Sequence, residues 1–352
     1  MRTFRSDNNA GLCPEALEAI ALANDGAHRT GYGDDAWSQR AAAAFRAIFR
    51  ADTSVFFVAT GTAANTLAIA ALSEPWEMVI AHRHSHWNDD ESTAPERITH
   101  TRLVAVDSRP DRIVPDDLRR VLSGLRGDVH QPQPGVVTIS NVTEFGTVYT
   151  PEEVRALTTL AHAHGFRVHM DGARFANAVA SLGCDARELT VDAGIDALSF
   201  GGTKNGLAFG EAVLFFEQGD GRAFERAVRT FPFHRKGLGH LLSKHRFVSA
   251  PFALTLESGA WLRHARHANA MARRLGEGLS RAGIAPHFPV QANGVFVRLP
   301  ERIDAHLQSV GHGYYPFGDA DLGLIRLMCS FDTEVKDVDA LLRDVAAGAG
   351  AG

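Results

Sequence analysis

The chain has 352 residues, of which 45% are hydrophobic and 22% are charged, a composition typical of a globular protein rather than a disordered one. Its net charge of -5 at pH 7 and its scattered basic residues argue against a nucleic-acid-binding surface. The N-terminal residues lack the apolar core of a signal peptide, and no later stretch approaches the roughly 20 apolar residues of a membrane span. We therefore expect a cytoplasmic protein without a membrane partner that acts on a small molecule.

Short apolar segments alternate with helical patterns along the first 250 residues. The expected strands cover residues 55–59, 78–81, 136–139, 168–170, 197–200 and 212–216, and helices are expected over 62–72 and 151–164. Such alternation is typical of an α/β fold, in which a mostly parallel sheet carries helices on both faces.

After residue 250 the pattern changes to one expected long helix over residues 252–281, which ends at Gly283. Beyond it we expect strands over 294–299 and 324–330 and helices over 303–310 and 334–346. The sequence thus predicts three parts, namely an N-terminal arm (1–30), a large domain (31–250) and a small C-terminal α+β domain (251–352).

The three cysteines, Cys13, Cys184 and Cys329, are far apart and form no C-x-x-C pair. An odd, dispersed set of cysteines indicates neither a disulfide framework nor a thiolate zinc site. A reducing compartment is expected, and no metal ligand is predicted.

Four polar clusters follow or overlap the ends of expected strands, at residues 60–65, 82–91, 171–174 and 199–206. Ligands of open α/β sheets gather beyond the carboxyl ends of the strands, so we expect the clusters to converge. In the first cluster, Gly61 lets the backbone approach an anion and Thr62 can cap a helix whose free N–H groups bind phosphate. An ordinary strand-to-helix turn would have the same sequence.

Two further clusters suit one cofactor. Asp171 could keep a pyridinium nitrogen protonated, as pyridoxal phosphate requires, although an aspartate next to a glycine is also common in turns. Lys204 lies in a glycine-framed loop after a strand, and a desolvated setting there would help its amine to form a Schiff base. The alternative for Lys204 is a solvated surface charge.

The fourth cluster contains three histidines at alternate positions. His82, His84 and His86 could share one face of an extended segment and, with Asp89 and Asp90, bind the metal of a hydrolase. The alternative is one imidazole stacked on a planar cofactor, with the others on a solvated loop. A hydrolase would leave the other three clusters unexplained.

Taken in order, these segments resemble the threonine aldolases, which belong to the aspartate-aminotransferase-like class (fold type I) of pyridoxal-phosphate enzymes. The likeness extends from Ser6 to Asp332. Within the family, the motifs of this sequence are most similar to those of the low-specificity and phenylserine branch. It rests on Arg5-Ser6-Asp7, Tyr32-Gly33-Asp34-Asp35, Thr60-Gly61-Thr62-Ala63-Ala64-Asn65, Asp171-Gly172-Ala173-Arg174 and Gly202-Thr203-Lys204-Asn205-Gly206. The resemblance implies a large domain with a mostly parallel, seven-stranded sheet.

The resemblance also implies the roles of the cofactor-binding residues, by matching position. Pyridoxal 5'-phosphate would form a Schiff base with Lys204. Asp171 would pair with the pyridine nitrogen, and Arg174 would contact the ring oxygen and the substrate. Gly61 and Thr62 would bind the phosphate.

On the substrate side, His86 would stack on the cofactor ring and His130 would lie near the substrate hydroxyl. Either histidine could be the catalytic base. Ser6 and Arg326 match the groups that hold the substrate carboxylate. These residues favour retro-aldol cleavage of L-threonine, L-allo-threonine or phenylserine into glycine and an aldehyde, over the reactions of other fold type I lyases and aminotransferases.

Two residues resemble groups that reach into the site of a neighbouring subunit. These are Tyr32, on the substrate side, and Lys236, on the cofactor side, so the resemblance implies a homodimer or homotetramer with shared sites. Residues 230–244 lack the glycine-rich run of many aldolases, which leaves the cross-subunit phosphate contact unplaced.

Overall fold

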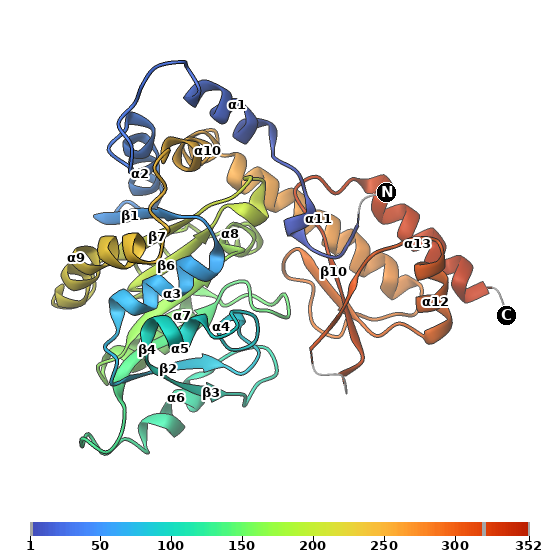
Figure 1. Ribbon diagram of the computed structural model, residues 1–352. Coiled ribbons are helices and arrows are strands. Elements are labelled where there is room, and N and C mark those ends of the chain that lie inside the picture. The colour runs from blue at the N-terminus through green and yellow to red at the C-terminus, as the bar shows by residue number, and fades with distance from the viewer. Residues whose placement is uncertain (1–2, 319–321, 351–352) are drawn as a thin grey trace.

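The computed structural model describes residues 3–318 and 322–350. Figure 1 shows two units, a larger one built on a seven-stranded sheet and a smaller one on a three-stranded sheet, joined by a long helix. This arrangement confirms the expected α/β fold. No helix in the described ranges is long and apolar enough to cross a membrane.

The large sheet has the strand order β1-β7-β6-β5-β4-β2-β3. Only β7 runs antiparallel to its neighbours, β1 and β6, which confirms the mostly parallel sheet. The strands are β1 (Thr53–Val58), β2 (Glu77–His82), β3 (Arg102–Val106), β4 (Gln133–Ser140), β5 (Arg167–Gly172), β6 (Ala197–Gly201) and β7 (Glu211–Phe216). The edge strand β3 was not expected, because its pattern is partly exposed and short.

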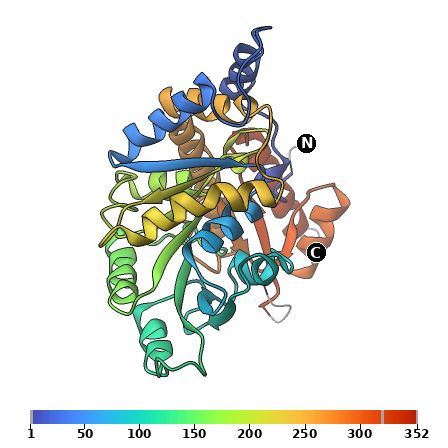
Figure 2. The same ribbon diagram turned by 60° about the vertical axis from the view of Figure 1, so that its left-hand side comes forward.

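Helices cover both faces of this sheet, and side chains alternate between the two faces because successive residues of a strand point in opposite directions. Along β7, Val213 and Phe215 pack in the core beneath α3, whereas Leu214 and Phe216 pack in the core of the opposite face. Figure 2 shows α9 lying across the first face. The helices of this face are α3 (Gly61–Leu72), α5 (Ala94–Thr99) and α9 (Arg222–Gly237).

The opposite face is covered by a second group of helices, with α1 packed on the outside against α10. They are α1 (Pro14–Ala23), α2 (Ala36–Phe49), α6 (Pro115–Leu122), α7 (Pro151–His162), α8 (Phe175–Leu182) and α10 (Arg246–Glu257).

The expectation of one long helix from residue 252 to 281 was wrong. The segment forms two helices, α10 and α11 (Ala260–Arg281), which are separated at Ser258 and Gly259. Gly259 has a φ of 69°, in the left-handed region that favours glycine, and the chain changes direction there.

The small unit contains the strand order β8-β10-β9. Its elements are β8 (Gly294–Val297), α12 (Glu301–Ser309), β9 (Tyr315–Phe317), β10 (Leu324–Met328) and α13 (Val335–Gly350). Phe4, at the other end of the chain, is buried in the core of this unit, and the Met328 N–H donates to its carbonyl. Since Phe252 and Trp261 still pack against the large core, the domain boundary at residue 250 stays a prediction.

Candidate active site

A cavity of about 370 Å³ opens beside the first turn of α3 and the ends of β5 and β6. Five of the residues expected in the site line it, namely Gly61, Thr62, His86, Asp171 and Lys204. They come from four separate clusters of the sequence, which the sheet brings to one edge because the carboxyl ends of parallel strands meet there.

The first turn of α3 forms one wall of the cavity. Thr60 caps the helix, since its Oγ1 accepts from the Ala63 N–H at 3.2 Å. The N–H groups of Gly61 and Thr62 belong to the first turn, where no helical carbonyl is available to accept them. A Cβ atom added at Gly61 would meet nothing within 4 Å, so the space in front of these donors suits an anion such as a phosphate.

Asp171, near the end of β5, is buried and hydrogen-bonded through both oxygens. The Ala173 N–H donates to Oδ1 and Asn65 Nδ2 donates to Oδ2, each at 2.9 Å. Burial alone would raise the pKa of Asp171, but the positive charges of His86 and Lys204 and the Ala173 hydrogen bond together lower it. A buried carboxylate held in its ionised form suits a cationic ring nitrogen.

His86 begins the short helix α4 (His86–Asp89). Its Nδ1 lies 2.9 Å from Oε1 of buried Glu91, which also accepts from Asn65 Nδ2 at 2.7 Å. Burial alone would lower the pKa of His86, yet the hydrogen bond to Glu91 and the charge of Asp171 raise it. Asn65 thus links the two carboxylates, a role that could not be predicted because Asp171 lies 106 residues away in the chain.

Lys204 lies in η2 (Thr203–Asn205), directly after β6. The preceding Gly201 is required by packing, because an added Cβ would lie 2.1 Å from the Ala173 carbonyl oxygen. Glu211, at the start of β7, accepts from the Gly202 N–H and lines the cavity. Burial raises the pKa of Glu211 to about 7, even though the Gly202 hydrogen bond opposes this effect.

Arg174 is not among the residues that line the cavity and forms a buried, bidentate ion pair with Asp7. Its Nε and Nη2 lie 2.7 and 3.0 Å from the two carboxylate oxygens, and Asn293 Nδ2 donates to Asp7 at 3.0 Å. Burial alone would raise the pKa of Asp7, but Arg174 and Lys204 lower it to about 2. This role of Asp7 could not be predicted from the sequence, because its partner lies 167 residues away.

The two residues expected to hold the carboxylate lie near this ion pair: Ser6 precedes Asp7 in the chain, and Arg326 is close enough for the charges of Arg174 and Asp7 to act on it. Ser6 Oγ accepts from the Asn8 N–H at 3.2 Å and so caps η1 (Asp7–Asn9). Arg326, on β10, has a buried Nε without a hydrogen-bond partner in the described part of the chain. Burial and the neighbouring Arg174 lower the pKa of Arg326. An unsatisfied guanidinium beside a second one suits an anionic ligand.

The structure does not bring His130 to this cavity. His130 is exposed and precedes β4, whereas the last residue of β4, Ser140, pairs with Asp171. An eight-residue strand spans about 23 Å, so His130 lies at the opposite edge of the sheet. The loop that follows β4, at the cavity end of the strand, carries Glu144. Burial lowers the pKa values of His86 and Arg174, and the negative charge of Glu144 is one of the causes that raise them.

Tyr32 and Lys236 are exposed and do not line the cavity. The Lys236 Nζ lies 5.3 Å from the centre of the Tyr32 ring, so the two expected cross-subunit residues are neighbours on one surface. Their reach into another subunit stays a prediction.

The three histidines of the hydrolase alternative have separate partners. His82 Nε2 contacts the Arg109 carbonyl at 2.8 Å, and His84 Nδ1 lies 3.4 Å from an Asp89 oxygen. His86 is held by Glu91. Within residues 3–318 and 322–350, these histidines form no group whose ligand atoms converge on one point.

Comparison with known proteins agrees with this geometry. Residues 3–302 match the model of the beta-eliminating lyase family. A low specificity L-threonine aldolase of a Pseudomonas species is 44% identical, over 98% of this chain and 97% of the relative. A Leishmania major threonine aldolase structure superimposes with a TM-score of 0.91 at 27% identity, with 99% of each chain covered. A Sphingomonas wittichii serine palmitoyltransferase shares the fold, with a TM-score of 0.72 at 17% identity over 99% of this chain and 87% of that one. The chain therefore belongs to the beta-eliminating lyase family, among the threonine aldolases.

Proposed function

We propose that this protein cleaves L-threonine, L-allo-threonine or a related β-hydroxy-α-amino acid such as phenylserine into glycine and an aldehyde, with pyridoxal 5'-phosphate as cofactor. The observation that carries the proposal is that Lys204, Asp171 and His86 line a single cavity beside the first turn of α3. The 44% identity to a low specificity L-threonine aldolase supports it.

The cavity fits the cofactor at each of its chemical groups. Gly61 and Thr62 would bind the phosphate, Asp171 would hold the ring nitrogen in its protonated form, and His86 would stack on the ring. Lys204 would supply the amine for the aldehyde group. When bound, pyridoxal phosphate accepts the electron pair released at the substrate Cα.

The substrate carboxylate would be held by Arg326, with help from Ser6. The buried Nε of Arg326 lacks a partner in the described residues, and a carboxylate would supply one through a planar, two-point contact. Such a contact fixes the torsion about Cα, and the bond that stands perpendicular to the cofactor ring is the bond that breaks. Arg174 is already paired with Asp7, so we assign it to orientation of the cofactor and support of Arg326.

His86 would remove the proton of the β-hydroxyl, and the support for this role is that it lines the cavity. Its Nδ1 faces Glu91, which leaves Nε2 for the substrate, either directly or through a water molecule. As this proton leaves, the Cα–Cβ bond breaks and the aldehyde departs, and a proton then adds to Cα to give glycine. General-base catalysis of this kind contributes roughly 10²–10⁴-fold. His130 has no part in this step within its own subunit.

The enzyme would work in the cytoplasm as at least a homodimer and, by the family resemblance, as a homotetramer. Exposed apolar side chains support an interface, since Phe209 at the cavity and Phe233 on α9 are 42% and 77% exposed. Mixing inactive Lys204→Ala chains with Lys236→Ala chains tests the shared site. If Lys236 reaches the neighbour, mixed dimers regain one intact site and activity returns. If it does not, the mixture is no more active than its parts.

The reaction itself is tested by incubating the purified holoenzyme with L-threonine or phenylserine and no added keto acid. Equimolar glycine and aldehyde support the proposal. A requirement for a keto acid would instead identify an aminotransferase. Lys204→Ala serves as the matched inactive control.

A further inference from the structure

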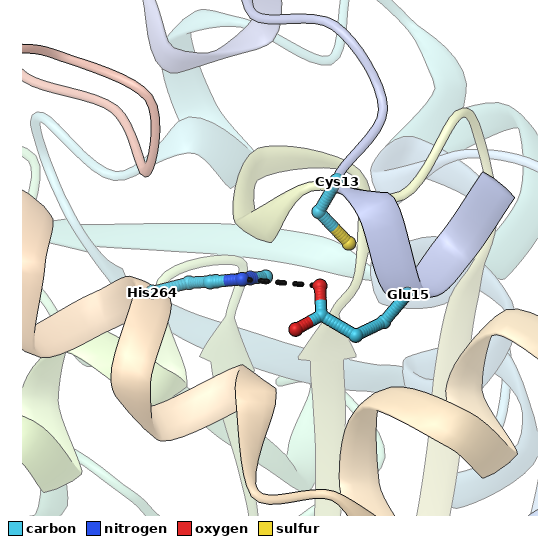
Figure 3. A group of neighbouring side chains, drawn as sticks. All are labelled: Cys13, Glu15 and His264. Carbon is cyan, nitrogen blue, oxygen red and sulfur yellow. Dashed lines mark ion pairs between the residues drawn. The ribbon is translucent and has the colours of Figure 1, made fainter. Parts of the chain in front are cut away.

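A second cluster of reactive side chains lies outside the cavity, where the N-terminal arm meets α11 (Figure 3). Cys13 precedes α1, Glu15 lies in its first turn, and His264 lies on α11. One ligand atom of each residue lies within 4.8 Å of the other two. None of the three residues lines the cofactor cavity.

The geometry of this cluster suits a tetrahedral metal ion. His264 Nε2 and Glu15 Oε2 are 3.4 Å apart, and two such ligands on a tetrahedral zinc ion, each at about 2.0 Å, would be about 3.3 Å apart. Glu15 Oε2 is buried and has no hydrogen-bond partner in the part of the chain that the structure describes. Its close contact is the ion-pair distance to His264, and a metal ion between the two side chains would give the oxygen a ligand bond.

The charges and the neighbouring contacts also fit. Arg263 Nη2 donates to Glu15 Oε1 at 2.9 Å and leaves Oε2 for a second partner. A thiolate and a carboxylate would supply two negative charges to a divalent cation, the carboxylate sharing its charge with Arg263, while the imidazole binds in its neutral form.

The cluster is joined to the loop that carries Lys204. The Cys13 N–H donates to the Gly206 carbonyl at 2.8 Å, and Asn205 Nδ2 donates to the Trp261 carbonyl of α11 at 2.8 Å. Gly206 has a φ of 101°, and an added Cβ there would lie 2.9 Å from the Cys13 Cβ. A change in the position of Cys13 would therefore shift the backbone at Gly206, two residues from Lys204.

We propose that Cys13, Glu15 and His264 bind one zinc ion per chain and that this ion fixes the N-terminal arm and α11 against the Lys204 loop. A water molecule would complete the four ligands, as in other three-ligand sites. The sequence gave no sign of the site, because His264 lies far along the chain from Cys13 and Glu15.

The test is a zinc titration of tag-free holoenzyme that has first been dialysed against a chelator. A chromophoric chelator competes for the metal, and mass spectrometry counts the zinc retained. We expect the wild type and the control Cys184→Ser to bind one zinc per chain, and Cys13→Ser and His264→Gln to lose about 100-fold or more in affinity. Far-ultraviolet circular dichroism and the visible absorption of the cofactor verify that each variant is folded and loaded.

Two results would overturn the proposal: wild-type enzyme that retains no zinc, or ligand variants that retain it as the wild type does. If Cys13→Ser does not fold, Glu15→Gln, which keeps the shape of the side chain, carries the same expectation. Cadmium provides an independent measurement of the thiolate. Its sulfur-to-metal absorption in the ultraviolet is expected in the wild type and in Cys184→Ser, and its absence from the wild type would contradict Cys13 as a ligand.

Discussion

The ion pair between Asp7 and Arg174 offers a quantitative test of how the arm is attached to the site. Both side chains are nearly inaccessible, at 0% and 9% exposure. The pKa of Asp7 is about 2, against an ordinary 3.8, which corresponds to about 2 kcal/mol of stabilisation. Asp7→Asn removes this stabilisation and leaves the guanidinium buried without a counter-charge beside Arg326, so we expect a loss of about 3–5 kcal/mol.

The measurement is urea denaturation of holoenzyme at fixed protein and cofactor concentrations. The control is Asp339→Asn, which breaks the bidentate but exposed ion pair between Asp339 and Arg274 and should cost about 0.5 kcal/mol or less. Because the pKa of Asp7 is lowered, its contribution is present above pH 4 and is lost as the pH falls towards 2. The difference between wild type and Asp7→Asn should therefore shrink only below pH 4. Equal losses for the two variants at pH 7 would refute the reasoning.

Three further predictions concern the cavity. Glu91→Gln removes the carboxylate that raises the pKa of His86, so the acidic limb of the pH–rate profile should move to lower pH, and an unmoved limb would argue against His86 as the base. Glu211 has a pKa raised from 4.5 to about 7 by burial, so the stability of cofactor-free wild type relative to Glu211→Gln should fall as the pH rises from about 4.5 to 7 and change little above 7; parallel stability curves would contradict this. Arg326→Lys loses the two-point contact with the substrate carboxylate and should reduce kcat/KM about 10- to 100-fold with a raised KM. A variant with the kinetics of the wild type would show that Arg326 does not bind the substrate.

The parallel sheet and the convergence of four clusters could be predicted because both depend on local sequence. The segment 168–170 was expected as a strand and lies within β5, and Asp171 follows it near the end of that strand. Ligands of parallel sheets gather at the carboxyl ends of the strands, which gave the expected position of the site. The edge strand β3 and the break at Gly259 were missed, because a partly exposed edge pattern is weak and an isolated glycine is compatible with a helix.

The contacts at the site that were not predicted have a common physical cause, which is that position along the chain does not give position in space. His130 was matched by its neighbours in sequence, but it lies before β4 rather than after it. The roles of Asp7 and Asn65 depend on partners more than 100 residues away. No periodicity or spacing in the sequence reports such contacts.

The central claim, that Lys204 holds the cofactor, is tested most directly by borohydride reduction of the holoenzyme followed by peptide mass spectrometry. The chain contains only four lysines, Lys204, Lys236, Lys244 and Lys336, so the modified residue can be assigned without ambiguity. We expect the pyridoxyl group on the peptide that contains Lys204 and a concurrent loss of the visible absorption band. A label on any other lysine, or no label on enzyme that was active before reduction, would contradict the account.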